Sequence, residues 1–281
     1  MRFGLKVNPA TWDDATHWAG VAEQAGFDSL WTGDNLRNSR DPQVPVHDGP
    51  TIVAAWAATT SSIRVGLLIA NMAYRRPTVL AKQAISLDHV SGGRFDLGIG
   101  SGLWPADHAM AGVPFWAPRE RAARLAEFVG VLDRLLAGDT ADHDGEYYPY
   151  HDAAVSPATL QARIPIIVAA NGPKALAVAA ERGDGWVTFP GTSGAEEFAH
   201  DTAQRARTLD ALCRDRGRDP GEVRRILLAY GAVSPWSSTD AFAVMVEQFG
   251  AMGVDEIVCY APKPDEQAVF DTIAGQLHKF R

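Results

Sequence analysis

The sequence predicts an α/β protein folded as a closed (β/α)8 barrel, a TIM barrel with extended loops at the carboxyl ends of its strands. Two observations support this fold. Eight strand-like segments alternate with eight helical segments, a pattern that implies parallel pairing through right-handed crossovers. The chain has 281 residues, and a barrel of this kind needs about 250. Because no linker divides the chain, we expect a single barrel domain over residues 1–281.

The strands are predicted from short apolar runs, several of which alternate with small or polar residues. We expect strands at residues 3–7, 28–32, 63–69, 95–99, 164–169, 185–189, 224–233 and 256–260. We expect helices at residues 12–25, 51–60, 77–91, 118–136, 173–182, 195–216, 239–252 and 265–279. Long loops are expected at residues 33–50 and 103–117, and residues 145–148 have the composition of a small hairpin.

Capping residues place several helix ends. Thr11 precedes the first helix as a side-chain cap, and Gly26 follows it as a stop. Pro77 suits the first turn of the third helix, which Gly92 and Gly93 end. An open nucleotide-binding sheet is the rival fold, but it usually carries its glycine fingerprint after the first strand. Here that turn contains Asn8 and Pro9 and no glycine, so the barrel is favoured.

Composition narrows the classes of function. The net charge of -8 and the pI of about 5.5 argue against a nucleic-acid binder, which needs a basic face. Cys213 and Cys259 have no zinc or disulfide spacing. The sequence shows neither a signal peptide nor a membrane-spanning run, so we expect a cytoplasmic protein that binds neither nucleic acid nor membrane.

No metal site is expected. The histidine and carboxylate pairs near predicted loops are His47 with Asp48 and Asp107 with His108. Neither pair has a ligand spacing typical of a metal centre, and we expect all four to be solvated loop residues.

The stretch 94–102 is the most unusual feature of the chain. A short strand ends there in Gly98, Gly100 and Gly102, with Ser101 between the last two. Glycine lets the backbone approach a ligand closely or take a positive φ, so this stretch is either a tight turn or a ligand cradle. In a barrel, active sites lie in loops that follow strands. These loops are rich in glycine and asparagine and poor in histidine and carboxylate, which suits a flat neutral or anionic ligand.

Two further features bear on that ligand. Gly172, Pro173 and Lys174 open a helix, where free N–H groups favour a phosphate, although Lys174 could equally be a solvated surface lysine. Four tryptophans fall near strand ends and either pack in the core or line an aromatic ligand site. They are Trp31, Trp104, Trp186 and Trp236.

Several segments together resemble the bacterial luciferase-like flavin-dependent oxidoreductases. The most specific is 87–102, reading LDHVSGGRFDLGIGSG, and the segments 62–66, 76–81, 112–115, 169–176 and 183–186 also fit. The resemblance covers roughly residues 3–260.

This resemblance implies an oxidoreductase barrel, usually a homodimer, that binds coenzyme F420 or reduced FMN and acts on a small-molecule substrate. It implies a bulge in the third strand with a non-prolyl cis peptide at Leu68–Ile69, and it places Asn71 close to the flavin ring. The loop Gly100-Ser101-Gly102 and the turn Ala170-Asn171-Gly172-Pro173-Lys174 are implied as cofactor contacts. The Gly-Pro-Lys turn favours the F420 branch over FMN.

Two positions depart from the pattern of the F420-dependent sugar and alcohol dehydrogenases. Asn35 stands where they carry a histidine, and Leu103 stands where they carry a glutamate. Neither side chain exchanges a proton, which argues against alcohol oxidation by that route. Asp34 and Asn35 remain the candidate catalytic residues, although Asp34 is equally suited to a cap or an ion pair. An FMN-dependent monooxygenase served by a separate flavin reductase and a non-catalytic flavin-binding barrel are the alternatives.

Overall fold

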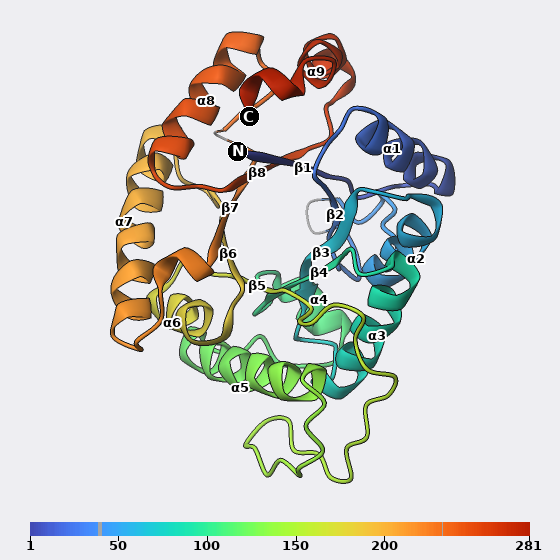
Figure 1. Ribbon diagram of the computed structural model, residues 1–281, viewed down its shortest axis with the longest axis vertical. Helices are drawn as coiled ribbons and strands as arrows, with labels where there is room; N and C mark the ends of the chain where they lie inside the picture. Colours follow the sequence, from blue (N-terminus) through green and yellow to red (C-terminus); the bar gives the residue numbers. More distant parts are fainter. Residues whose placement is uncertain (39–40, 232) are drawn as a thin grey trace.

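The protein is a closed barrel of eight parallel strands surrounded by helices (Figure 1). The computed structural model describes residues 1–38, 41–231 and 233–281. Each strand pairs with its neighbour in sequence, and β8 closes the barrel against β1. The strands are β1 (Arg2–Lys6), β2 (Ser29–Thr32), β3 (Arg64–Asn71), β4 (Phe95–Gly100), β5 (Ile166–Ala169), β6 (Gly185–Thr188), β7 (Arg224–Ala229) and β8 (Glu256–Tyr260). The predicted (β/α)8 fold is therefore confirmed.

The helices lie outside the strands in chain order (Figure 1). They are α1 (Trp12–Gln24), α2 (Gly49–Thr59), α3 (Pro77–Ser91), α4 (Pro105–Met110), α5 (Pro118–Leu136), α6 (Pro173–Arg182), α7 (Ala195–Arg214), α8 (Thr239–Ala251) and α9 (Gln267–Ala274). Thr11 caps α1 as predicted, in a reciprocal capping box with Asp14. Gly92 ends α3 with a φ of 63°, a conformation that glycine adopts without steric cost.

Four predicted elements need correction. The loop 103–117 contains α4, a single short helix that begins at Pro105. The strand predicted over 224–233 ends at Ala229, because the chain turns at Gly231 with a φ of 63°; residue 232 lies outside the described residues. The helix predicted over 265–279 is divided at Gly275 into α9 and a 3-10 turn. The hairpin predicted at 145–148 reduces to one antiparallel bridge between His143 and Tyr150. Residues 39–40 of the loop 33–50 are also outside the described residues.

The barrel interior and the layer between strands and helices form separate hydrophobic clusters. Phe3 and Leu5 of β1, with Val7 just after it, face the helices and belong to the larger cluster. The interior cluster includes Trp31, and a Cβ on Gly66 would overlap the indole ring of Trp31. Glycine on β3 therefore makes room for the largest side chain inside the barrel.

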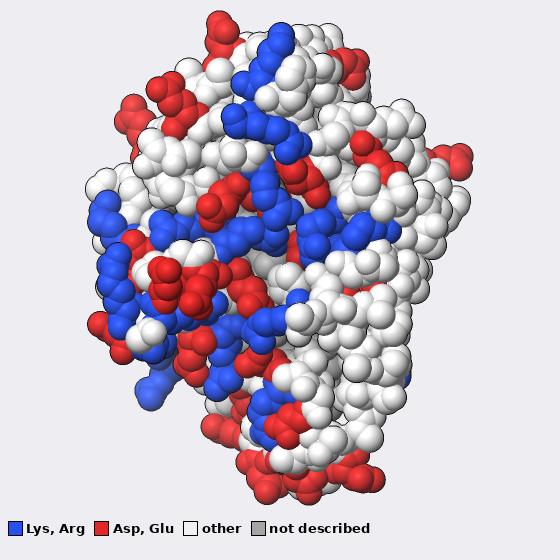
Figure 2. Space-filling model, viewed as in Figure 1, with Lys and Arg blue, Asp and Glu red and all other residues white. Residues whose placement is uncertain are grey.

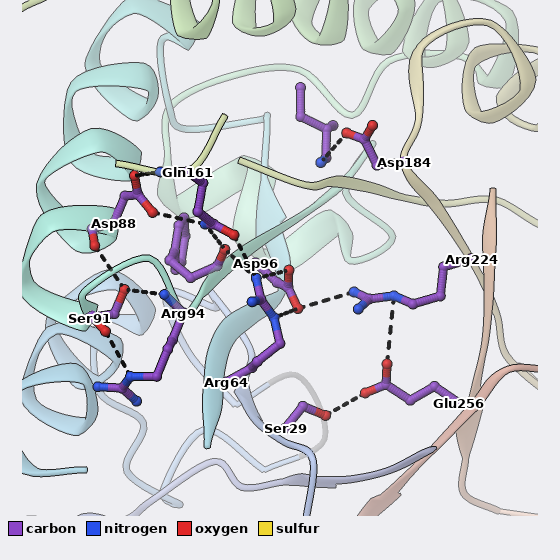
Figure 3. A network of polar contacts seen from close by, with 12 residues as sticks. Ser29, Arg64, Asp88, Ser91, Arg94, Asp96, Gln161, Asp184, Arg224 and Glu256 are labelled. Carbon is purple, nitrogen blue, oxygen red and sulfur yellow. Dashed lines mark hydrogen bonds and ion pairs between the residues drawn. The ribbon is translucent and has the colours of Figure 1, made fainter. Parts of the chain in front are cut away.

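A polar network closes the barrel at the amino ends of the strands (Figure 3). Arg64 and Arg224 approach the buried carboxylate of Asp96 from two sides, with N–O distances of 2.7 and 3.1 Å. Burial works to raise the pKa of Asp96, but the charges of Arg224 and Arg64 outweigh it and hold this pKa below its usual value. Glu256 accepts a hydrogen bond from Ser29 and lies 3.7 Å from Arg224. These contacts tie β2, β3, β4, β7 and β8 together at the end remote from the post-strand loops.

Charged side chains are unevenly distributed on the face shown in Figure 2. Lys and Arg are interspersed with Asp and Glu around its centre, whereas the flank over α2 and α3 carries few charges. Among the helices of the described residues, none is both long enough and apolar enough to cross a membrane.

Candidate active site

A cavity of about 1000 Å³ opens among the loops at the carboxyl ends of the strands. Its walls come from the carboxyl ends of β1 and of β3 to β8, the loops after β1, β2 and β4 to β8, and the beginnings of α5 and α6. The residue types suit a flat, partly polar ligand, because the lining combines apolar and aromatic side chains with glycine and asparagine.

Twelve of the thirteen site residues predicted from the sequence line this cavity. They are Asp34, Asn35, Leu68, Ile69, Asn71, Gly100, Ser101, Gly102, Asn171, Gly172, Pro173 and Lys174. Ala170 does not line it: the residue is buried, and its carbonyl oxygen accepts a hydrogen bond from Nε1 of Trp186 at 2.6 Å.

The bulge implied for the third strand is present on the cavity wall. The pairing of β3 with β4 shifts register between Leu67 and Ala70, and the peptide bond Leu68–Ile69 is cis. Both residues of that bond line the cavity. Asn71 follows on the same strand, and its side-chain oxygen accepts a hydrogen bond from the amide of Ala73 at 2.9 Å.

The glycines of β4 fit against this bulge. A Cβ on Gly98 would overlap the carbonyl oxygen of Leu67, and a Cβ on Gly100 would overlap the side chain of Ile69. Gly102 has a φ of 74°, and a Cβ there would lie 2.6 Å from Nε2 of His108. Gly98 therefore makes room for the bulge, and Gly100 and Gly102 line the cavity, where the ligand cradle was predicted.

Asp34 is held in an ion pair at the rim of the barrel. Its carboxylate accepts two hydrogen bonds from Arg75, at 2.6 and 2.7 Å, and one from the amide of Asn71 at 3.3 Å. The hydroxyl of Tyr74 donates to the main-chain oxygen of Asp34. Burial, followed by the charge of Asp34, raises the pKa of Tyr74. The Asp34 carboxylate and the Tyr74 hydroxyl therefore both stabilise the loop after β2.

The contacts of Asn35 show that the prediction for Asp107 and His108 needs correction. The side-chain amide of Asn35 donates to Oδ2 of Asp107 at 3.2 Å. Asp107 and His108 are fully buried on α4, although they were predicted to be solvated loop residues. Phe115 and Trp116 enclose the His108 ring edge-on, with centroids 5.0 and 5.1 Å away, so the prediction was wrong because the loop 103–117 folds back on itself.

His47 and Asp48 are exposed, as predicted. Asp48 caps α2 through the amide of Thr51 and forms an ion pair with Arg75 at 2.7 Å. Partial burial works to raise the pKa of Asp48, but the bonds from Thr51 and Arg75 outweigh it, so this pKa is lowered. Within the described residues, no three His, Cys, Asp or Glu side chains are grouped as a metal site.

The first turn of α6 forms one part of the cavity wall. Gly172 caps this helix without any side-chain hydrogen bond, and Pro173 occupies its first turn. A Cβ on Gly172 would meet nothing within 4 Å, so open space lies beside this turn. Lys174 is exposed on the same wall. Asn171 bonds to the carbonyl oxygen of Phe189 at 2.8 Å and joins this turn to the loop after β6.

Comparison with known families agrees with this geometry. The profile of the family described as luciferase-like monooxygenase matches residues 2–254, which is most of the chain. The chain belongs to this family.

Named relatives of this luciferase-like barrel are oxidoreductases. This chain is 36% identical over 214 residues to an F420-dependent glucose-6-phosphate dehydrogenase of Kineococcus radiotolerans. The match covers 75% of this chain and 61% of that protein. This chain is 32% identical over 226 residues to a 5,10-methylenetetrahydromethanopterin reductase of Methanolobus tindarius, covering 79% and 63%. The chain thus spans about three fifths of the length of the curated relatives it matches.

Solved structures agree on the architecture. An F420-dependent secondary alcohol dehydrogenase, determined with an F420-acetone adduct, superposes on the luciferase-like barrel with a TM-score of 0.88, covering 100% of this chain and 99% of that chain. The sequence identity is 16%, so this similarity shows the fold alone.

The tryptophans of this luciferase-like protein divide between the two roles left open. Trp31 and Trp186 are buried in the core and do not line the cavity. Trp104 is 42% exposed and lines it, and Trp236 lines it while stacking on Phe242 at 5.7 Å.

Lys6 is a cavity residue that sequence reasoning missed. It is the last residue of β1 and only 4% exposed, with its ammonium group donating to the carbonyl oxygen of Leu68. Burial lowers the pKa of Lys6 to about 7. The signal in the sequence was its register: Phe3, Leu5 and Val7 alternate toward the helices, which turns Lys6 into the barrel.

Proposed function

We propose that this protein is a coenzyme F420-dependent oxidoreductase that transfers a hydride between the deazaflavin and a small organic substrate. The observation that carries the proposal is the cavity wall that joins the Leu68–Ile69 bulge, the loop 100–102 and the uncapped first turn of α6. The relatives named for F420 support the same cofactor. The homodimer implied by the resemblance is part of this proposal.

The residues present fit such a group. A cavity of about 1000 Å³ has room for a flat tricyclic ring, and Gly100 and Gly102 expose backbone rather than side chain along one wall. The ring would lie against the bulge at Leu68 and Ile69. The phosphate would lie at the first turn of α6, where free N–H groups and Lys174 favour an anion.

The bound deazaflavin supplies hydride chemistry, and the protein supplies positioning and proton transfer. Asn35 donates to Asp107, and Leu103 is apolar, so neither accepts a proton from an alcohol. Asp34 is engaged with Arg75 and Asn71. This set of side chains favours reduction of an activated double bond or an imine over alcohol oxidation.

Turnover assays with different classes of substrate test this proposal. Purified protein with reduced F420 should reduce α,β-unsaturated carbonyl compounds or cyclic imines, followed by the return of the absorbance of oxidised F420. Oxidised F420 with sugar phosphates or secondary alcohols should give no comparable rate. Turnover restricted to alcohols would contradict the proposed substrate class.

FMN is the alternative cofactor. A 4-hydroxyprotoasukamycin monooxygenase of Streptomyces nodosus subsp. asukaensis, 29% identical over 202 residues, is a relative named for oxygen chemistry. If the protein worked in this way, it would consume oxygen when a separate reductase supplied reduced FMN. Oxygen uptake coupled to substrate hydroxylation would favour this alternative.

A further inference from the structure

Among the described residues that line the cavity, Lys6 is the one buried lysine, and it lies beside Gly33 near Asn35, where the resemblance expects a histidine. Nζ of Lys6 donates to the oxygen of Leu68, which belongs to the cis peptide bond at the bulge. The rest of the Lys6 side chain is enclosed, since the residue is only 4% exposed, yet it lines the cavity.

Polar groups converge on the same point. A Cβ placed on Gly33 would lie 2.9 Å from Oδ1 of Asn35, 3.2 Å from Oδ1 of Asn8 and 3.5 Å from Nζ of Lys6. The ring of Tyr260 lies below the ammonium group, with its centroid 5.5 Å from Nζ. These groups all line the cavity beside the bulge.

No carboxylate neutralises this lysine within the described segments, because none of the ion pairs there includes Lys6. The titratable and charged groups around it come from several elements. Asp34 follows β2 and is paired with Arg75; Tyr230 follows β7; Tyr260 ends β8, and Lys263 and Glu266 lie in the segment after it. Desolvation alone therefore sets the acidity of Lys6, and it lowers the pKa to about 7.

We propose that Lys6 is the catalytic proton donor of this site. The inference rests on the proposed function. In reduction, one atom of the substrate double bond accepts a hydride, and the other atom, an enolate carbon or an imine nitrogen, accepts a proton from Nζ of Lys6. The ammonium group becomes a neutral amine, and solvent returns its proton before the next turnover. The reduced deazaflavin supplies both electrons, so atoms and charges balance.

A polar but uncharged variant separates this role from a structural one. In Lys6→Gln, the side-chain amide can still donate a hydrogen bond to the oxygen of Leu68, but it has no proton to transfer. We expect cofactor affinity to stay near that of the wild type, whereas kcat falls about 10²- to 10⁴-fold. We also expect the change of kcat with pH near neutrality to disappear. A Lys6→Gln variant with wild-type kcat and pH profile would overturn the proposal.

A measurement without cofactor keeps the proposal testable if no turnover is found. The chain has five lysines, so carbon NMR of lysine labelled at Cε gives few signals, and Lys6→Met identifies the one from Lys6. We expect this signal to titrate near pH 7 in the folded protein and near pH 10.5 in urea. A midpoint near 10.5 in the folded protein would overturn the role of Lys6, whereas failure to bind F420 would overturn the proposed function instead.

Discussion

Lys174 and Lys6 both line the cavity, but one is surrounded by solvent and the other by protein. Because of this difference in burial, we expect the two lysines to have different roles. An exposed lysine beside a helix N-terminus attracts an anion. A buried lysine without an ion pair exchanges its proton near neutral pH.

Replacing Lys174 by alanine should weaken cofactor binding. The lost charge-assisted contact to the phosphate is of order 1.5–3 kcal/mol, which a fluorescence titration resolves easily. Lys279→Ala, an exposed lysine near the carboxyl terminus, is the matched control and should bind as the wild type does. Equal affinities for both variants would show that Lys174 is only a surface residue.

Lys6 should make the stability of the protein depend on pH. Between its folded pKa of about 7 and its ordinary value of 10.5, the unfolded chain binds a proton that the folded chain does not. Wild-type stability relative to Lys6→Met should therefore rise with pH in this window, by up to about 1.4 kcal/mol per pH unit. Urea unfolding of both proteins across the window measures the difference, and a constant difference would refute the assignment.

At the scale of elements, the bulge in β3 and the glycines of β4 form one unit. Gly98 is closed to any side chain, because its would-be Cβ overlaps the backbone of Leu67. We expect Gly98→Ala to destabilise the barrel by about 3 kcal/mol, the cost of overpacking a rigid site. Thermal unfolding measures this loss.

The matched control for that variant is Gly20→Ala on α1. A Cβ at Gly20 meets only Gln24, at 4.0 Å, so alanine should be neutral or stabilise by about 0.4–1 kcal/mol. If Gly98→Ala were as stable as Gly20→Ala, the close packing of β4 against the bulge would be wrong.

Helix ends marked by nearby capping residues could be predicted from the sequence. Burial that depends on residues from other parts of the chain could not. The ends of α1 and α3 were predictable because Thr11 and Gly92 act within a single turn. The burial of Asp107 and His108 was missed because it depends on Phe115 and Trp116 folding over a six-residue helix.

The candidate site shows the same division. The turn at Gly172 was visible as a motif, and the family resemblance supplied the cis bond at Leu68–Ile69. Lys6 was missed because a lysine at the end of a strand is usually exposed, and only closure of the barrel buries it.

At the scale of the whole molecule, residues that stabilise the fold and residues that line the cavity lie at opposite ends of the barrel. The network of Asp96, Arg64 and Arg224 closes the amino ends of the strands, while the cavity lies at their carboxyl ends. Asp96→Asn should leave two cations without their shared carboxylate and cost about 3–5 kcal/mol in unfolding free energy, with cofactor affinity unchanged in the folded fraction.

Denaturant unfolding at neutral pH measures that cost, and Asp265→Asn, an exposed carboxylate, serves as its control. Because the pKa of Asp96 is lowered in the folded protein, its contribution is present at neutral pH and is lost as the pH falls through that value. The stabilities of wild type and Asp96→Asn should therefore converge in acid. A constant gap would contradict the ionised network.

We propose that this luciferase-like barrel holds a deazaflavin in the cavity at its carboxyl face. The most direct test is a fluorescence titration of the purified protein with oxidised F420 and, separately, with FMN, together with the Lys174→Ala variant. We predict tight, saturable binding of F420, weaker binding to the variant and little binding of FMN. Tight binding of FMN alone would contradict the assigned cofactor, and binding of neither would contradict a flavin-type site altogether.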